Sequence, residues 1–395
     1  MRPRMAIVGA GIGGLTLALA LRERGVPVEL FEQASRLSEI GAAVALSANA
    51  TRVLGRLGVG DRLGAVSAEP SELIFRNWRD GERVAAHPVG RDGWYRARFG
   101  APYYGVHRKD LQGILGAAWG TEGLYLGRRL TGLRDGPDGV RLTFADGATA
   151  EADVVVGADG IRSAVRQWVT GAEDTVFSGT SGFRGIVPVD RLPSLSDPAA
   201  IQFWMGPGAH LLHYAIGADA GQVNFLAVVE GPRHWAGPEW RADVTDAEVR
   251  AAFDGWHPAV TEMVGSVAHR ERWGLFGVRA LERWSRGRVV LLGDAAHGML
   301  PHQGQGANQT VEDAALLAEL LSGPEDPATV FERYEALRRP RTRRVQHLSW
   351  VTNRVLHLPD GPEARERNVR LRVLPESIGW IHEHDVVAGL GLRPA

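Results

Sequence analysis

Apolar residues near the start of the chain fall into short runs that glycines and charged residues separate. Met5–Val8 and Val28–Phe31 have the length and composition of buried strands, and Leu15–Arg24 has the pattern of a helix. The glycine-rich turn Gly9–Gly14 separates the first strand from this helix. The pattern therefore predicts a βαβ unit at the beginning of the chain.

The next part of the chain departs from a simple alternation of strands and helices. A helical stretch is expected around Asn49–Leu63, and Ser71–His87 reads as short strands with polar interruptions. Two aspartate–glycine turns between Leu124 and Asp159 predict hairpins. The segment ends in the apolar run Asp153–Val156, which is typical of a strand in a parallel sheet.

Strands and helices also alternate unevenly in the second half of the chain. Gly182–Val229 predicts several strands of a mostly antiparallel layer, and Val289–Leu292 predicts another buried strand. The glycine-rich loop Gly293–Gly306 then leads into a helix that ends near Leu321. From Pro327 onward the pattern is mainly helical.

Composition bounds the class of protein. A chain of 395 residues exceeds the size at which one core stops growing, about 250–300 residues, so two domains are expected. The formal net charge of −1 gives no field that would favour nucleic acid or an acidic membrane. The absence of cysteine excludes disulfides, thiolate metal sites and thiol catalysis, so redox work would need a cofactor.

The apolar N-terminal run from Met5 to Leu21 could be mistaken for a targeting or membrane segment. Four glycines interrupt it, charged residues follow at once, and it is shorter than the roughly 20 residues of a spanning helix. We therefore expect a soluble, cytoplasmic protein without a membrane or nucleic-acid partner.

The turn after the first strand matches the dinucleotide-binding pattern G-x-G-x-x-G. Gly9 would make the tight turn, Gly11 would let the backbone approach a pyrophosphate, and Gly14 would let helix and strand pack closely. Glu32 ends the second strand, where a carboxylate accepts hydrogen bonds from ribose hydroxyls. The pattern predicts a dinucleotide, leaves NAD and FAD open, and has a purely structural glycine turn as its alternative.

Two further turns place an acid after a strand. Asp294 ends the strand near 289–292, where it would face the hydroxyls of a ribityl chain or cap a tight turn. The loop that follows reaches a helix start whose free amides would stabilise negative charge on a reduced flavin. Asp159 follows the strand near 153–156, and it would either cap a helix or reach toward a pyrophosphate.

Together these segments resemble a known family. GAGIGG with Glu32, GADGIRSAVR and GDAAHGMLPHQGQGANQTVEDA, in this order, are similar to the single-component FAD-dependent aromatic hydroxylases, the superfamily of p-hydroxybenzoate hydroxylase. The resemblance spans nearly the whole chain. Tyr104–Leu111, Gly206–Tyr214 and Tyr334–Pro340 look most like the salicylate and 3-hydroxybenzoate hydroxylase branch.

The resemblance implies a set of cofactor contacts. It places the FAD pyrophosphate at Gly11–Gly14, the adenosine ribose at Glu32, a flavin contact at Arg108 and the ribityl chain at Asp294. It places the isoalloxazine against Pro301, Gly306, Ala307 and Asn308, and it gives Asp159 a role toward both FAD and NADH or NADPH. No separate nicotinamide fingerprint is present in the sequence, which also fits that family.

The expected fold is α/β: a Rossmann-like FAD-binding domain with an inserted, mostly antiparallel β-sheet substrate domain and a C-terminal helical region. The FAD-binding domain is predicted to be discontinuous. Its expected segments are 1–72, 100–176 and 276–322, with the substrate domain at 73–99 and 177–275 and the helical region at 323–395.

The resemblance implies a monooxygenase that uses NADH or NADPH and O2 to hydroxylate a small phenolic or heteroaromatic substrate through a flavin C4a-hydroperoxide. Two other enzyme classes stay open on the same fold, a flavin-dependent dehydrogenase or reductase and an epoxidase. A flavin-binding or NAD-binding protein without catalysis is the non-enzymatic alternative. The expected state is a monomer or a homodimer.

The substrate residues are hypotheses from strand geometry. His210, Leu212 and Tyr214 would share one face of a strand, so His210 and Tyr214 are candidates for catalytic contact with the substrate, as a His or Tyr base would be, with a pair on a solvated face as the alternative. His213 would point to the opposite face, which disfavours a metal shared with His210. No metal site is expected.

His302 and Arg184 are two further candidates for the site, and each also has a purely structural alternative. His302 would reach the substrate or the flavin edge, or else bond the backbone of its own loop. Arg184 would meet a carboxylate or gate the flavin, or else lie exposed on the surface. The arginine-rich stretch Arg338–Arg344 is expected to be a solvated helix paired with acids.

Overall fold

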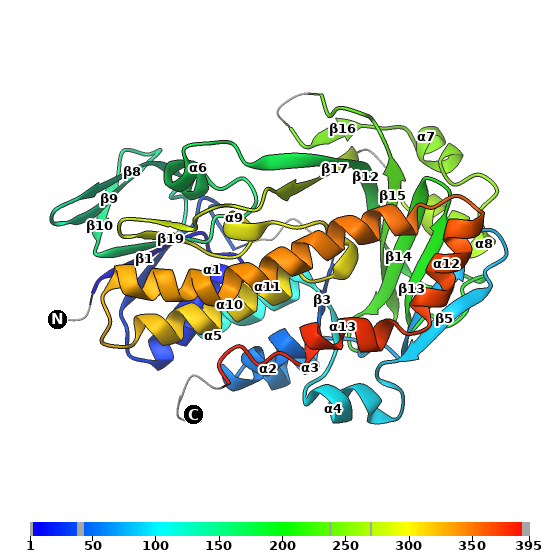
Figure 1. Cartoon of the computed structure of the whole chain (residues 1–395), viewed down its shortest axis with the longest axis horizontal. Helices are drawn as coiled ribbons and strands as arrows, with labels where there is room; N and C mark the ends of the chain where they lie inside the picture. Colours follow the sequence, from blue (N-terminus) through cyan, green and yellow to red (C-terminus); the bar gives the residue numbers. More distant parts are fainter. Residues whose placement is uncertain (1–2, 38–42, 237–238, 269–270, 389–395) are drawn as a thin grey trace.

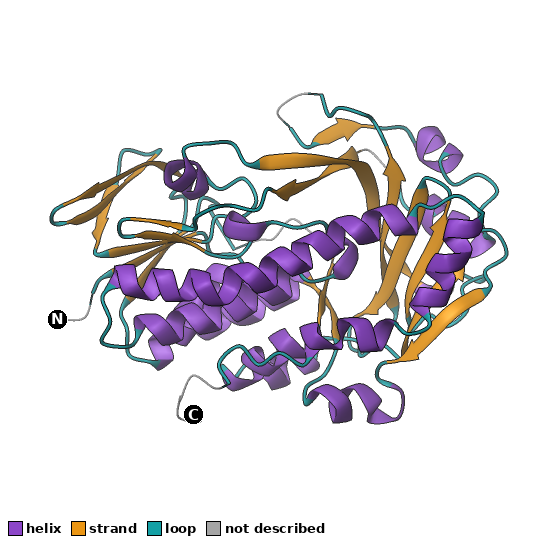
Figure 2. Ribbon diagram, in the orientation of Figure 1, coloured by secondary structure: helices purple, strands orange, loops and turns teal. Residues whose placement is uncertain are grey.

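Two large β-sheets lie at opposite ends of an elongated molecule, and helices run between them (Figure 1). The computed structural model describes residues 3–37, 43–236, 239–268 and 271–388. The long helix α11 (Pro327–Leu356) extends from the smaller of these two sheets toward the larger one (Figure 2). Residues 389–395 of the predicted C-terminal region lie outside the described part.

The first large sheet gathers six strands from distant parts of the sequence, in the order β18-β19-β11-β1-β2-β7. Its central strands are parallel and buried, and β18 forms an antiparallel edge. The βαβ unit predicted at the start of the chain is confirmed. The strands are β1 (Met5–Val8), β2 (Val28–Phe31), β7 (Leu124–Tyr125), β11 (Val154–Gly157), β18 (Ser285–Arg286) and β19 (Val289–Leu291).

Helix α1 (Ile12–Glu23) is the core helix of this end of the molecule. It is apolar on all sides, as expected of a helix with neighbours all round, and every residue from Ile12 to Leu21 is buried. It packs between α5 (Arg108–Trp119) and α10 (Gly306–Leu321). The N-terminus of α1 is thereby fixed at the carboxyl ends of the parallel strands.

A small antiparallel sheet of three strands lies beside the six-stranded sheet, at the edge of the molecule (Figure 1). It contains β8 (Leu130–Gly136), β9 (Gly139–Phe144) and β10 (Thr149–Ala152). Each neighbouring pair is antiparallel. The hairpins predicted from the two aspartate–glycine turns are confirmed.

The second large sheet has eight strands in the order β16-β17-β12-β15-β14-β13-β4-β5. All pairs are antiparallel except β13 with β4. One face packs on α7 (Asp246–Ala251) and α8 (Pro258–Gly265). The strands are β4 (Glu72–Asn77), β5 (Arg83–Pro88), β12 (Thr175–Pro188), β13 (Ile201–Gly206), β14 (Ala209–Ile216), β15 (Gln222–Glu230), β16 (Arg241–Asp243) and β17 (Glu271–Val278).

The remaining elements connect the two sheets or cover the space between them. The two-stranded pair β3 (Ala43–Leu46) and β6 (Tyr104–His107) lies near β14. The stretch predicted as helical near 49–63 forms two helices, α2 (Ala48–Arg56) and α3 (Gly60–Gly64). The other helices are α4 (Trp94–Phe99), α6 (Ala164–Thr170), α9 (Asp294–His297), α12 (Pro362–Leu371) and α13 (Leu374–His382). None of the helices in the described ranges is long and apolar enough to cross a membrane.

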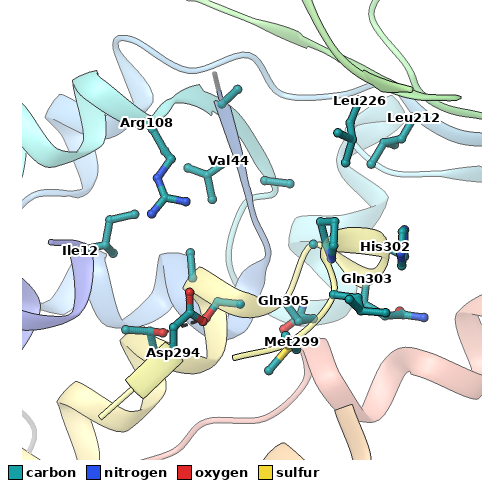
Figure 3. A pocket seen from close by; sticks show the side chains of 18 of the residues that line it. Ile12, Val44, Arg108, Leu212, Leu226, Asp294, Met299, His302, Gln303 and Gln305 are labelled. Carbon is teal, nitrogen blue, oxygen red and sulfur yellow. Dashed lines mark hydrogen bonds between the residues drawn. The ribbon is translucent and has the colours of Figure 1, made fainter. Parts of the chain in front are cut away.

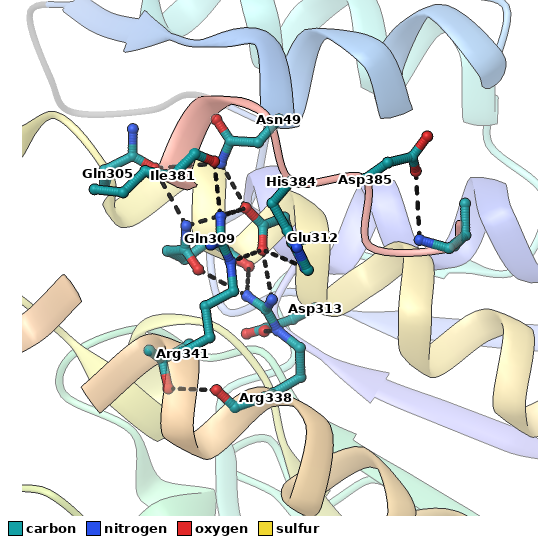
Figure 4. A network of polar contacts seen from close by, with 12 residues as sticks. Asn49, Gln305, Gln309, Glu312, Asp313, Arg338, Arg341, Ile381, His384 and Asp385 are labelled. Atoms are coloured by element: carbon teal, nitrogen blue, oxygen red, sulfur yellow. Dashed lines mark hydrogen bonds and ion pairs between the residues drawn. The ribbon is translucent and has the colours of Figure 1, made fainter. Parts of the chain in front are cut away.

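The arginine-rich part of α11 is not solvated as expected, because it turns one arginine into the interior (Figure 4). Arg338 is 1% exposed and bonds Glu312 at 2.5 Å and Asp313 at 2.6 Å, both of them on α10. Arg341 adds a second bond to Glu312 at 2.8 Å. The expected pairing with acids is confirmed, but the expected exposure is wrong, since α11 packs directly on α10.

Candidate active site

A cavity of about 1080 Å3 lies between the six-stranded and the eight-stranded sheet. Pockets for drug-sized ligands measure roughly 300–1,000 Å3, and this cavity exceeds that range, so it suits a dinucleotide together with a small second molecule. Its walls come from the turn after β1, the loop before α10, the open face of the eight-stranded sheet and the C-terminal helices. Figure 3 shows Arg108, Asp294 and the loop at Met299–Gln305 around one part of it.

The glycine turn at Gly9–Gly14 is required by close packing. A Cβ atom on Gly14 would lie 1.9 Å from the carbonyl oxygen of Gly9, and one on Gly9 would lie 2.4 Å from that of Ala158. Gly9 also has φ +104°, a conformation that favours glycine. Gly11 caps α1 and lines the cavity, so the first amides of α1 are available to a phosphate.

Glu32 is held rigidly at the end of β2. Its two carboxylate oxygens accept hydrogen bonds from the amides of Ala10 and Ala34, each at 2.8 Å. The side chain also lines the cavity. Because a carboxylate oxygen accepts more than one hydrogen bond, both oxygens retain capacity for the hydroxyls of a ribose.

Asp159 caps the start of a helix and also faces the cavity. It accepts from the Ser163 hydroxyl at 2.5 Å and from the Val165 amide at 3.1 Å, which fixes the start of α6. It also lines the cavity. Burial raises the pKa of its carboxyl, although the bonds from Ser163 and Val165 oppose that shift.

The loop before α10 presents backbone to the cavity. Asp294, Pro301, Gly306 and Ala307 all line it, and α10 begins at Gly306. Helix N-termini carry free amides and a positive partial charge, which suits the pyrimidine edge of a flavin. Asn308 lies behind this surface. Its side chain accepts from the Ser47 amide at 2.8 Å and donates to the carbonyls of Ala45 and Gly304 at 2.9 and 2.6 Å.

Opposite this loop, β14 supplies Leu212 and Tyr214 to the cavity wall. Burial raises the pKa of the Tyr214 phenol, so the hydroxyl stays protonated. Arg184 also lines the cavity, with its guanidinium carbon 3.9 Å from the centroid of the Trp273 ring. The alternative of a fully exposed Arg184 is wrong, because β12 turns the side chain inward over Trp273.

His210 is fully buried, so its alternative as part of a solvated pair is also wrong. It lies behind the wall, where its Nδ1 atom is 2.6 Å from Nε2 of His357. His302 does line the cavity. Neither of its ring nitrogens has a hydrogen-bond partner within the described residues, so the alternative of a bond to its own loop does not hold. Burial lowers its pKa to about 3, with His357 as the second cause.

The C-terminal helices contribute residues that carried no local signal in the sequence. Arg367 on α12 and His382 at the end of α13 line the cavity. Arg367 donates to the carbonyl of Val355 at 3.2 Å, and burial lowers its pKa. The place of Arg367 and His382 in the cavity wall becomes visible only when these helices are packed over the eight-stranded sheet. Across the described ranges, no group of three or more His, Cys, Asp or Glu residues is placed to hold a metal ion.

Known proteins resemble the chain over nearly its full length. A family model described as "FAD binding domain" matches residues 3–349. The 3-amino-4-hydroxybenzoate 2-monooxygenase of Streptomyces cremeus is 40% identical, over 96% of this chain and 94% of that protein. The salicylate hydroxylase of Pseudomonas putida is 34% identical, over 97% and 93%.

Solved structures agree with these relatives. HpxO of Klebsiella pneumoniae, solved with FAD and uric acid, superimposes with a TM-score of 0.85 at 28% identity and covers 98% of each chain. The glycine turn, the fixed carboxylate of Glu32 and the helix start at Gly306 fit the same cofactor. The expected FAD, NAD(P)H and monooxygenase chemistry are confirmed. The chain belongs to the FAD-binding family of flavoprotein monooxygenases, as an aromatic hydroxylase.

Proposed function

We propose that this hydroxylase acts on a single hydroxylated aromatic or heteroaromatic ring that carries a carboxylate. The observation that carries the proposal is the composition of the wall opposite the flavin loop. Apolar side chains from the eight-stranded sheet form its flat part, among them Phe75, Phe203 and Leu212. Arg184 and Arg367 also line the cavity, and each is partly desolvated, which strengthens attraction to an anion.

The proposed cofactor contacts follow the cavity lining. Backbone at Gly9 and Gly11 would receive the pyrophosphate, Glu32 the ribose, Asp294 the ribityl chain, and Pro301, Gly306 and Ala307 the ring system. Gly14 does not line the cavity and would act by letting α1 pack closely on the turn. Arg108 and Asp159 also face this space, and Asn308 acts by fixing the loop to β3. When bound, FAD supplies the activation of oxygen, with NADH or NADPH as the reductant.

Tyr214 and His302 would have different roles toward the substrate, one as a hydrogen-bond donor and the other as a proton acceptor. Tyr214 keeps its proton because burial raises its pKa, so it donates a hydrogen bond to a substrate oxygen. His302 is neutral because burial lowers its pKa, so a ring nitrogen is able to accept the phenolic proton, and the phenolate left beside it would offset the cost of charging the buried ring. Removing that proton makes the ring more nucleophilic. The apolar wall excludes water, which prevents side reactions that would consume oxygen without hydroxylating the substrate.

The proposal also assigns a role to each domain of the chain. The unit around the six-stranded sheet, residues 1–72, 100–176 and 276–322, would bind FAD, and residues 73–99 and 177–275 would hold the substrate. The helical region from residue 323 would close the cavity. We propose a cytoplasmic enzyme that works as a monomer or a homodimer.

Incubation with NADH or NADPH and 18O2 tests the activity. A panel of hydroxybenzoates, aminohydroxybenzoates and hydroxypyridine carboxylates is expected to contain a ring that stimulates NAD(P)H oxidation and gains one labelled oxygen atom. The matching rings without a carboxylate are expected to stimulate far less, because Arg184 and Arg367 then lack their partner. Turnover with an artificial electron acceptor and no labelled product would instead indicate a dehydrogenase.

Asp294→Ala is expected to weaken FAD binding. A hydrogen bond to a charged group contributes about 1.5–3 kcal/mol, which corresponds to roughly a 10-fold to 150-fold rise in Kd. Titration of the apoprotein with FAD, followed by flavin fluorescence, measures this change. Glu122→Gln is the control, because Glu122 is an exposed acid in the turn before β7. Equal affinities for both variants would refute the ribityl contact.

A further inference from the structure

Helix α13 presents one polar side chain to the cavity. Leu374, Ile378 and His382 are spaced four residues apart on this helix, so they lie on one face of it, and all three line the cavity. Pro375 and Gly379 are the other members of α13 in the wall. Among the described residues of α13, His382 is therefore the one whose side chain offers the cavity a hydrogen bond.

Aromatic rings surround the imidazole of His382. The centroids of the Phe99, Tyr95 and Tyr103 rings lie 5.4, 5.7 and 6.2 Å from its own centroid. The hydroxyl of Tyr103 reaches the loop before α10, since a Cβ atom on Gly304 would lie 3.9 Å from it. His382 is thus separated by a single aromatic side chain from the loop that is proposed to hold the isoalloxazine.

Two hydrogen bonds decide which nitrogen of His382 carries the proton. The amide of Ala48 donates to the Tyr95 oxygen at 3.1 Å, and this oxygen lies 3.0 Å from Nδ1 of His382. Burial raises the pKa of Tyr95 well above its usual value, so the phenol keeps its proton. Among the described residues, Nδ1 of His382 is the acceptor within reach of that proton. Because Nδ1 accepts, the neutral imidazole carries its own proton on Nε2.

Nε2 of His382 is therefore a donor that has no acceptor of its own. Burial lowers the pKa of His382 to about 4, with Arg341 as the second cause, so the ring is neutral near pH 7. Nε2 has no hydrogen-bond partner within the described residues, and the side chain lines the cavity. An unpaired donor in a largely apolar wall costs free energy, which favours a ligand that supplies an acceptor over one that does not.

We propose that His382 determines specificity by donating a hydrogen bond from Nε2 to a second substituent of the substrate ring, a carbonyl-type oxygen distinct from the carboxylate. The inference rests on the proposed function and deepens it. The phenolic oxygen lies with Tyr214 and His302, whereas the second oxygen points toward α13. Tyr95 is a positioning residue, because its hydroxyl holds the imidazole in the donating tautomer. A substituent that is apolar, or that only donates, leaves the Nε2 proton unpaired.

Binding of two matched ligands to the FAD-loaded protein tests this role without turnover. 3-Formyl-5-hydroxybenzoate and 3-hydroxy-5-vinylbenzoate have nearly the same shape, but only the formyl ligand carries the acceptor oxygen. The wild type is expected to bind the formyl ligand about two-fold to ten-fold more tightly, the range for one neutral hydrogen bond, as measured by the change in flavin absorbance. His382→Phe is expected to bind both ligands equally. His382→Gln is expected to recover part of the preference, because its amide donates.

15N NMR of the protein with labelled histidine reports the tautomer directly. The His382 signal, identified by its absence in His382→Gln, is expected to show the proton on Nε2 in the wild type. Tyr95→Phe removes the hydroxyl that donates to Nδ1. This variant is expected to show both tautomers and a weaker preference for the formyl ligand, with the FAD content of the wild type.

His384→Gln is the matched control. His384 follows two residues later, and burial also lowers its pKa to about 4, but it does not line the cavity. It is expected to keep the wild-type preference. Equal binding of the two ligands by the wild type, or an undiminished preference in His382→Phe, would overturn the proposal. Weaker FAD binding in both His382 variants would also overturn it, since the donor would then serve the flavin. A preference for the formyl ligand without labelled oxygen in any ring would instead refute the proposed function and leave the donor role of His382 intact.

Discussion

Replacing Arg338 with methionine is expected to lower the free energy of unfolding by about 3–5 kcal/mol. Methionine keeps much of the side-chain volume but removes the charge that Glu312 and Asp313 share. Both acids are fully buried, and Arg338 bonds them at 2.5 and 2.6 Å. An ion left in the interior without its partner keeps its desolvation cost and loses its attraction. Denaturant unfolding of the FAD-loaded protein measures the loss.

Arg339→Met is the control for that prediction. Arg339 is the next residue on α11 and pairs with Glu335 one helical turn away, at 3.2 Å, with its side chain 24% exposed. A pair of this kind contributes less than about 1 kcal/mol. Equal losses in the two variants would show that the interior charges do not depend on Arg338.

The pH dependence of the free energy of unfolding is an independent test of the ion pairs between Arg338, Glu312 and Asp313. Burial raises the pKa of Glu312, but Arg338 and Arg341 outweigh it and hold the value at about 2. A folded pKa below that of the unfolded chain stabilises the protein at higher pH, and this contribution is lost as the pH falls toward 2. In Arg338→Met the folded pKa of Glu312 rises, so this part of the pH dependence is expected to shrink.

The cofactor half of the site was predictable from sequence because its constraints are local. Gly14 must be glycine because the Gly9 carbonyl lies where its Cβ would be, and Gly11 and Ile12 follow within the same turn. Glu32 and Asp294 each follow shortly after a strand, so their place at the sheet edge follows from the strand pattern alone. The central parallel strands were predictable for the same reason, since their apolar runs are continuous and short.

The substrate half was less predictable because distant segments build it. His357 and Arg367 carry no motif, and they reach the site only because α11 and α12 pack against the substrate sheet. Arg338 was expected to be solvated, since nothing in its helix reveals that α10 presents two acids to it. His210 and Tyr214 were correctly placed on one strand face, but the sequence did not show that His302 separates His210 from the cavity.

His302→Gln is expected to lower kcat by about 10²-fold to 10⁴-fold, the range for loss of a general base. Glutamine keeps a hydrogen-bonding side chain at the wall but cannot take up a proton, so KM and FAD affinity are expected to change little. Because the pKa of His302 is about 3, the residue is neutral from pH 5 to 9 on any ordinary titration curve, and the loss is expected throughout that range. Rates of labelled product formation, measured beside NAD(P)H consumption, separate slow hydroxylation from uncoupled oxidation.

His213→Gln is the control that distinguishes this role from the general effect of removing a buried histidine. His213 is fully buried on the opposite face of β14, and burial also lowers its pKa to about 3, with Arg76 as the second cause. Its environment resembles that of His302, except that it has no access to the cavity. Its replacement is expected to reduce stability and to leave kcat near the wild-type value. A fall in kcat of similar size in both variants would mean that the loss reflects the removal of any buried histidine and not a catalytic role of His302. Another group would then have to accept the proton of the substrate.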